Sequence, residues 1–219
     1  FEEERELTVM LLVDVSGSLN FGTSVMQKRE MITEIAATLA FSAIQNNDKI
    51  GVIFFSDKVE KFIPPQKGRK HILYIIRELL DFQPDSQGTN VSVGIEYLRQ
   101  AIKRRCTAFI LSDFIDEHDF MIPLSIANRK HDLVAIQVYD RRVAELPNIG
   151  MMKVVDAETG HERYIDTSSK AVRNRQAAWW KEHQNHLSDT FTRSNVDFVN
   201  VRSDQDYVAA LMSLFAQRG

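Results

Sequence analysis

The stretch Leu7–Ser18, LTVMLLVDVSGS, decides the fold class of this chain. It begins with a continuous apolar run and ends in an aspartate and two serines at alternating positions. An apolar run without alternation is typical of a strand buried on both faces of a parallel sheet. The polar end fits a plain turn, the front half of a phosphotransfer site or one wall of a metal site, and the rest of the chain has to separate these interpretations.

Strands and helices alternate after this first strand. Apolar segments indicate the strands, and apolar residues at three- and four-residue spacing indicate the helices. The expected strands are Leu7–Val13, Lys49–Phe55, Val59–Ile63, Thr107–Leu111, Leu133–Tyr139 and Val196–Val201, and the expected helices cover about 24–46, 69–80, 90–104, 115–129 and 206–217. This order predicts an α/β fold, a doubly wound, Rossmann-like three-layer sandwich with a mostly parallel sheet.

One strand is expected to run antiparallel at the edge of the sheet. Val59–Ile63 follows the preceding strand after only three residues, alternates apolar with charged side chains and runs into Pro64-Pro65. Prolines and charges are typical of edge strands, because an edge strand leaves one row of backbone groups unpaired.

The regular alternation of strands and helices is interrupted between Asp140 and Ser194. A hairpin is expected from 151–155 and 162–165, followed by a long helix over 169–191 in which Trp180 faces the core. We therefore expect a single domain over residues 1–219, with this segment as an elaboration between the last two strands. The chain opens without an initiator methionine or a signal peptide, so we expect a fragment of a longer protein. Whether a membrane anchor precedes this fragment is left open.

Composition excludes several classes of function. The chain has 27 basic and 30 acidic residues, a net charge of −3, so no nucleic-acid partner is expected. Cys106 is the only cysteine, which rules out an internal disulfide and a cysteine-based zinc site. No apolar run approaches the roughly 20 residues that cross a bilayer, so we expect no membrane contact from this segment and a cytoplasmic location.

Oxygen side chains gather where the expected strands end. Asp14, Ser16 and Ser18 follow the first strand, Thr89 precedes a helix, and Asp113 follows the TAFIL strand. Ligands of open α/β sheets bind beyond the carboxyl ends of the strands. An all-oxygen set suits Mg²⁺ or Mn²⁺, Ca²⁺ less well, and argues against zinc and copper.

The charge of this set suggests a role. We expect the three hydroxyls to bind the ion directly, and Asp14 and Asp113 to act directly or through water. Such an ion stays electron-poor at its open position and attracts an acidic residue of a partner protein. Ser112 and Asn20 flank the motif, and a supporting role for them is the alternative to their being plain neighbours, whereas Asp116, Glu117 and Asp119 are expected on a solvated surface or at a helix N-terminus.

Other interpretations stay open. The serines and Thr89 could cap helices, and Asp113 could simply end its strand. The chain has no nucleotide-binding glycine loop and no GxSxG elbow, and Ser16 stands where phosphotransferases similar to haloacid dehalogenases need a second acid. We therefore expect no enzyme, with a metal-dependent hydrolase or phosphatase and a structural domain with a non-functional site as the alternatives.

The motif Asp14-x-Ser16-x-Ser18, followed by Thr89 and Asp113, resembles the metal-ion-dependent adhesion site of von Willebrand factor A domains. All five positions of that motif are filled, and the order of elements is similar over most of the chain. The resemblance implies a non-enzymatic, metal-assisted protein-interaction module.

A narrower resemblance rests on the flanking sequence. The segments FEEERELTVMLLVDVSGSL, ITEIAATLAFSAIQNNDKIGVIFFSD and DAETGHERYIDTSS are similar to bacterial DUF58 proteins. These proteins carry an A-type domain and are typically encoded beside MoxR-type AAA+ ATPases. The resemblance implies that the chain acts in an ATPase-linked chaperone or maturation system, with the ATPase or its client as its binding partner.

Overall fold

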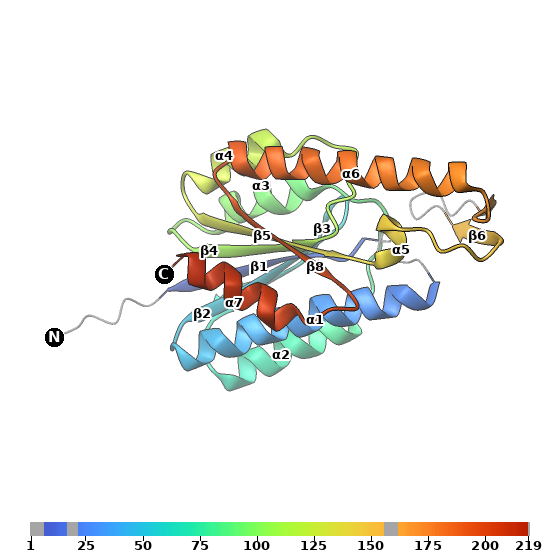
Figure 1. Cartoon of the computed structure of the whole chain (residues 1–219). Coiled ribbons are helices and arrows are strands. Elements are labelled where there is room, and N and C mark those ends of the chain that lie inside the picture. Colours follow the sequence, from blue (N-terminus) through green and yellow to red (C-terminus); the bar gives the residue numbers. More distant parts are fainter. Residues whose placement is uncertain (1–6, 17–21, 156–161, 219) are drawn as a thin grey trace.

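The computed structural model in Figure 1 describes residues 7–16, 22–155 and 162–218. Six strands form one sheet in the order β3-β2-β1-β4-β5-β8. All neighbours in this sheet are parallel except β2 and β3, which run antiparallel. The strands are β1 (Thr8–Asp14), β2 (Lys49–Phe55), β3 (Val59–Gln66), β4 (Thr107–Ser112), β5 (Asp132–Tyr139) and β8 (Asp197–Arg202).

Helices cover both faces of this sheet, which gives the three layers that the sequence predicts (Figure 1). One face is covered by α1 (Gly22–Gln45), α2 (Arg69–Asp81) and α7 (Tyr207–Arg218), and the other by α3 (Val91–Ala101), α4 (Met121–Asn128) and α6 (Lys170–Arg193). The prediction of a doubly wound, mostly parallel α/β sandwich with one antiparallel edge strand is confirmed.

The core lies on both faces of β1. Leu11 and Val13 point into the layer below the sheet, and Met10 and Leu12 point into the layer above it. All four side chains are buried, because β1 has a parallel neighbour on each side and a helical layer on each face. This burial explains why the first strand is a continuous apolar run instead of an alternating one.

The edge strand is longer than the sequence predicts. It continues through Pro64-Pro65 to Gln66, which pairs with Ile50 of β2. Proline is tolerated there because β3 has a hydrogen-bonded neighbour on one side only. A shift in register between Ile50 and Val52 accommodates the extra length.

The helix expected over 115–129 begins later, at Met121. The preceding segment is held by aspartates that accept hydrogen bonds from the amide two residues further on. Asp113, Asp116 and Asp119 bind the amides of residues 115, 118 and 121 in this way. Such side-chain bonds compete with helical hydrogen bonding, so the prediction of helix over 115–120 was wrong.

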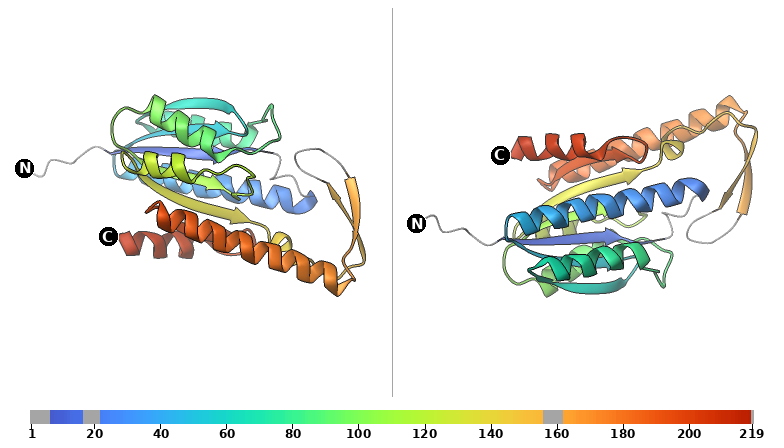
Figure 2. Two further views of the ribbon diagram at one scale, coloured as in Figure 1. Left: turned by 90° about the horizontal axis from the view of Figure 1, so that it is seen from above. Right: turned by 90° about the horizontal axis from the view of Figure 1, so that it is seen from below.

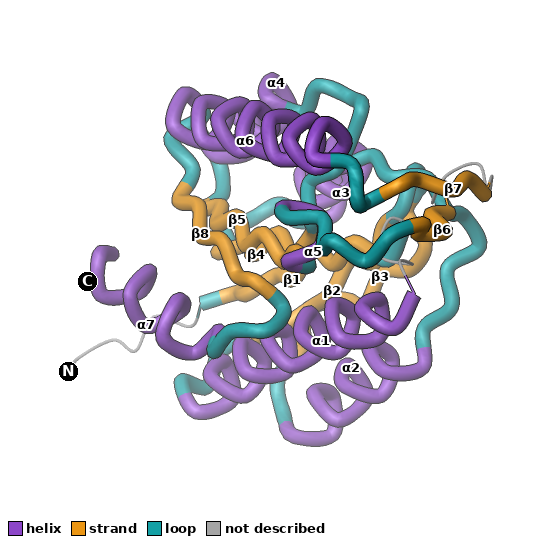
Figure 3. The backbone as a smooth tube through the Cα atoms, turned by 45° about the vertical axis from the view of Figure 1, so that its right-hand side comes forward, coloured by secondary structure: helices purple, strands orange, loops and turns teal. Residues whose placement is uncertain are grey.

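The segment between β5 and β8 departs from the alternation of strand and helix. A short helix, α5 (Arg141–Ala144), is followed by β6 (Met151–Val155) and β7 (Glu162–Asp166), which pair antiparallel in a sheet of their own (Figure 3). Both views of Figure 2 place this hairpin beyond the end at which β1 and β5 finish. The hairpin is confirmed, and Trp180 of α6 is buried as expected.

The assignment of the whole chain to one domain stays a prediction. None of the helices in the described ranges combines the length and the apolar character needed to span a bilayer.

Candidate functional site

The candidate site lies where the chain changes direction in the sheet. From β1 the chain moves outward to β2 and β3, and it then returns to place β4 on the other side of β1. Asp14 ends β1 and Asp113 follows β4 directly. Because β1 and β4 are adjacent and parallel, both aspartates stand at the carboxyl edge beside this switch point, where open α/β sheets bind ligands.

Asp14 is a fully buried carboxylate that is held on both oxygens. Its Oδ1 accepts the amide of Ser16 at 2.9 Å, and its Oδ2 accepts the hydroxyl of Ser112 at 2.5 Å. Burial raises the pKa of Asp14 to about 6, the negative charge of Asp113 adds to this rise, and hydrogen bonds from Ser112 and from Ser16 oppose it. Of the two alternatives for Ser112, this direct contact favours a supporting role beside Asp14.

Ser16 and Thr89 meet across the site. Each is 2% exposed, and the Thr89 hydroxyl donates a 2.7 Å hydrogen bond to the Ser16 hydroxyl. The loop that carries Ser16 is fixed to the sheet because the amide of Val15 donates to the carbonyl of Phe55 at 2.8 Å. Two hydroxyls and two carboxylates from distant parts of the sequence thus share one edge of the sheet.

Asp113 is also fully buried, and its backbone is tied to the neighbouring strand. Its carbonyl accepts the side-chain amide of Gln137 at 2.9 Å, and its Oδ1 accepts the amide of Ile115 at 3.0 Å. Phe114 has a φ of 55°, in the left-handed region, so the chain turns sharply after the aspartate. The turn keeps Asp113 at the strand end instead of carrying it into a helix.

Ser18 and Asn20 lie outside the described residues. Of the five predicted site residues, the structure therefore describes Asp14, Ser16, Thr89 and Asp113. In the described ranges, no three His, Cys, Asp or Glu side chains gather closely enough to hold a metal ion by themselves. A cation at this edge would depend on hydroxyl oxygens beside the two carboxylates, and such an all-oxygen set fits Mg²⁺ or Mn²⁺.

A small cavity adjoins Asp14 and Ser16. Its volume is about 100 Å³, and it lies between the end of β1, helix α1 and the loop that follows α2. Arg29 and Gln87 contribute polar side chains to its wall, and the Arg29 guanidinium donates to the carbonyl of Phe82. The buried pair of Asp14 and Ser16 is thus bordered by space on its α1 side.

Asp116 is a residue whose role the sequence does not reveal. We expect it on a solvated surface, but its side chain is fully buried. Its Oδ2 accepts the amide of Val91 at 2.7 Å, so it joins the loop after β4 to the first residue of α3, two positions after Thr89. Acidic residues also flank it in sequence, and nothing in that pattern marks this one as buried.

A chain of side-chain amides approaches Asp113 from α6. Asn200 of β8 donates to Gln184 at 3.1 Å, Gln184 donates to Gln137 at 3.0 Å, and Gln137 donates to the Asp113 carbonyl. These residues have no motif in the sequence, because only the packing of α6 beside β5 and β8 brings them together.

Comparisons with known proteins bear on the fold and the family. Residues 1–186 match the family model described as "Protein of unknown function DUF58". The uncharacterized protein Rv1480 of Mycobacterium tuberculosis is 30% identical over 217 residues, which cover 98% of this chain and 68% of that protein.

Two solved structures have a similar fold. The conserved hypothetical protein BatB of Bacteroides thetaiotaomicron has a TM-score of 0.59 at 15% identity, covering 97% of each chain. An aerotolerance-related membrane protein of Bacteroides fragilis has a TM-score of 0.60 at 15% identity, covering 96% of this chain and 99% of that one. At this identity the likeness concerns the fold alone.

Proposed function

Because the chain belongs to the DUF58 family and has a von Willebrand factor A-like fold, we propose that it is a non-enzymatic, divalent-metal-dependent protein-interaction module. One observation carries the proposal. Buried Asp14 and Asp113 flank the switch point of the sheet, and the Ser16 and Thr89 hydroxyls meet at 2.7 Å beside them. A plain turn has no need to bury two carboxylates at one edge.

The residues that would hold the ion are Ser16, Ser18 and Thr89 directly, with Asp14 and Asp113 direct or through water. Ser112 and the Ser16 amide orient the Asp14 carboxylate, and Gln137 fixes the backbone of Asp113. A bound Mg²⁺ or Mn²⁺ would supply a Lewis-acidic position for a carboxylate of the partner.

We propose a MoxR-type AAA+ ATPase or its client as that partner, and the cytoplasm as the location, since such an ATPase uses cytoplasmic ATP. The support for this partner is the resemblance to DUF58 proteins in the flanking sequence. The partner's recognition element would be an Asp or Glu side chain, because a hard cation prefers charged oxygen.

Metal binding is tested first, on the purified chain. Calorimetric titration with Mg²⁺ and with Mn²⁺ should give saturable binding that Asp14→Ala abolishes. Asp81→Ala is the matched control, because Asp81 is an exposed aspartate at the end of α2 that pairs with Arg77. Equal binding by Asp14→Ala and the parent chain would place the ion elsewhere and refute the site.

Partner binding is tested by pull-down with a purified MoxR-type AAA+ ATPase of the same organism, with Mg²⁺ and with EDTA. EDTA also removes the metal that the ATPase itself needs, so Asp14→Ala in Mg²⁺ is the decisive sample. The parent chain and Asp81→Ala should retain the ATPase in Mg²⁺, and Asp14→Ala should not. Equal recovery by all three proteins would refute metal-gated binding.

The rival enzymatic function has its own test. A screen of phosphoester and carboxylic ester substrates with Mg²⁺ and Mn²⁺ should detect no turnover. Metal-dependent turnover that Asp14→Asn abolishes would favour a hydrolase or phosphatase over an interaction module.

A further inference from the structure

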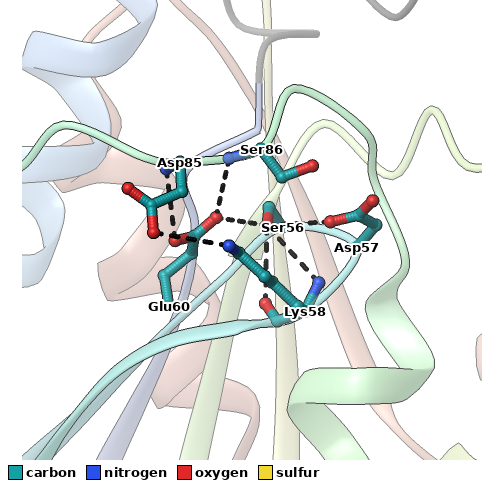
Figure 4. A network of polar contacts seen from close by, with 6 residues as sticks. All are labelled: Ser56, Asp57, Lys58, Glu60, Asp85 and Ser86. Carbon is teal, nitrogen blue, oxygen red and sulfur yellow. Dashed lines mark hydrogen bonds and ion pairs between the residues drawn. The ribbon is translucent and has the colours of Figure 1, made fainter.

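The loop between α2 and α3, residues 82–90, carries Thr89, and we call it the Thr89 loop. Several contacts hold it against the turn that joins β2 to β3 (Figure 4). The amide of Asn90 donates to the carbonyl of Ser56 at 3.0 Å. A Cβ added to Gly88 would lie 3.3 Å from the Asp57 side chain, so the loop and the turn are in close contact. The position of Thr89 thus depends on a hairpin that contributes none of the predicted metal ligands.

Glu60 of β3 is the centre of these contacts. Its Oε1 accepts the Ser56 hydroxyl at 2.7 Å and the amide of Ser86 at 3.1 Å. Its Oε2 accepts the amide of Asp85 at 3.2 Å. Figure 4 shows this carboxylate between the turn and the Thr89 loop. One side chain therefore binds two successive backbone amides of the loop, three and four residues before Thr89.

An ion pair at Asp85 is a weaker contact of the same part of the loop. Lys58 pairs with Asp85 at 3.4 Å, but both side chains are largely exposed, with 51% and 82% of their surface accessible. Exposed ion pairs of this kind contribute little, because water screens the charges and ordering long side chains costs entropy. Hydrogen bonds from amides to a carboxylate are stronger, since the acceptor is charged. Glu60 is therefore the main polar anchor of this part of the loop.

We propose that Glu60 is a positioning residue that sets the place of the Thr89 hydroxyl and thereby the metal affinity of the site. This inference rests on the proposed function. Glu60 touches neither Asp14 nor Ser16, and it acts through the backbone of the Thr89 loop. Residues that orient metal ligands commonly change metal affinity about 10- to 100-fold when they are removed.

The test compares four variants of the full chain. Glu60→Ala removes the carboxylate, and Glu60→Gln keeps one acceptor oxygen in a side chain of the same size. Glu78→Ala and Glu78→Gln are the matched controls, because the Glu78 side chain joins α2 to β3 through a 2.7 Å contact with Lys61. Glu78 contacts the Thr89 loop only through its backbone carbonyl, at the Phe82 amide, and these substitutions leave that carbonyl in place. Mg²⁺ and Mn²⁺ affinities are measured well below the melting temperature of each variant, so that loss of fold does not enter.

A second measurement reports on the loop itself. Hydrogen exchange of the Asp85 and Ser86 amides is followed without metal. Glu60→Ala should speed their exchange and weaken Mg²⁺ binding about tenfold or more, Glu60→Gln should lie between it and the parent, and both Glu78 variants should match the parent. Partial rescue by glutamine separates positioning from a general loss of stability.

Each outcome is decisive. Parent-like Mg²⁺ affinity in Glu60→Ala would overturn the inference and leave the proposed function standing. If Glu60→Ala does not fold, Glu60→Gln decides alone, and parent-like affinity in that variant overturns the inference. If the parent chain binds neither ion, the proposed function fails, and the role of Glu60 in metal affinity fails with it.

Discussion

The hydroxyl of Thr89 donates a 2.7 Å hydrogen bond to the hydroxyl of Ser16, which lies 73 positions earlier in the chain. Both side chains are buried at the carboxyl edge of the sheet, so the bond joins the loop after β1 to the loop before α3. We expect Thr89→Val to break this bond and to lower the free energy of unfolding by about 1 kcal/mol, because valine fills the same volume without a donor.

Thr89→Val should also weaken Mg²⁺ binding, since Thr89 is a proposed ligand. Calorimetric titration measures the affinity, and denaturant unfolding measures the stability. Thr190→Val is the matched control, because Thr190 is a buried threonine on α6 and is not part of the proposed site. Equal Mg²⁺ affinity in the two variants would contradict the assignment of Thr89.

Asp14→Asn should stabilise the metal-free protein at pH 7. The pKa of Asp14 is raised from 3.8 to about 6, so the unfolded chain loses this proton at lower pH than the folded chain does. The contribution of Asp14 to the free energy of unfolding therefore falls as pH rises from about 4 to 6, and at pH 7 it lowers that free energy by at most about 3 kcal/mol. Asparagine has no charge to bury and avoids this penalty.

Metal should work against the stability advantage of Asp14→Asn over the parent chain. Mg²⁺ should raise the melting temperature of the parent chain and leave that of Asp14→Asn unchanged, because a ligand stabilises only the protein that binds it. Denaturant unfolding in EDTA and thermal unfolding in Mg²⁺ give the two quantities. An Asp14→Asn variant that is less stable than the parent in EDTA would show that the carboxylate has a structural role without metal.

His131 should make the protein sensitive to acid. Its side chain is buried, and burial lowers its pKa from 6.5 to about 4, with nearby Lys130 adding to this effect. The unfolded chain gains a proton below pH 6.5 while the folded chain stays neutral, so this contribution is complete above pH 6.5 and falls as pH drops towards 4, by at most about 3 kcal/mol.

The measurement is the difference in unfolding free energy between the parent and His131→Gln, at steps from pH 7.5 to 4.5. Taking the difference removes the opposite contribution of Asp14 over the same range. The difference should shrink as pH falls, because the variant has no imidazole to protonate. A difference that is constant over this range would contradict a buried neutral histidine.

Gln137→Met should destabilise the protein more than Gln184→Met does. Gln137 is buried, and its side-chain amide donates a hydrogen bond to the Asp113 carbonyl. Methionine fills the same space but has no amide, so this hydrogen bond is lost. The Asp113 backbone keeps a contact with His183, so the cost expected is that of one lost hydrogen bond, about 0.5–1.5 kcal/mol. Gln184 is less buried, so water can replace part of what its contacts to Gln137 and Asn200 provide.

Denaturant unfolding of the two methionine variants measures this order. Asp113 is a proposed metal ligand, and Gln137 holds its backbone. Gln137→Met should therefore also weaken Mg²⁺ binding, and Gln184→Met should weaken it less. Equal stability losses in both variants would mean that the amide chain acts as one unit instead of through its buried member.

Much of the fold could be predicted from local patterns. The continuous apolar run of β1 and the alternation in β3 report on the burial of successive residues, which is a local property of a strand. The hairpin of β6 and β7 could be predicted from the turn-like sequence 156–160 between two short strand-like segments. The first six residues of the helix expected over 115–129 were predicted wrongly, because the prediction used the same kind of local pattern. Its apolar residues match a helix, but Asp113, Asp116 and Asp119 bind the amides of residues 115, 118 and 121, which takes these amides out of helical hydrogen bonding.

Part of the site could be predicted as well. Asp14, Ser16, Thr89 and Asp113 stand at the ends of predicted elements, so their place at one edge of the sheet followed from the general behaviour of parallel strands. Asp116 and Glu60 could not be found in this way, because an acid that accepts backbone amides and an acid that faces water look alike in sequence.

The sequence by itself determined the class of sheet and the oxygen chemistry available at its carboxyl edge, because apolar periodicity and residue type are written along the chain. Only the tertiary structure decided that β4 lies beside β1, that Ser112 reaches Asp14 across 98 positions and that Glu60 holds the Thr89 loop. The physical reason is that such contacts depend on strand order and register, which are set by packing the whole core and not by any local segment.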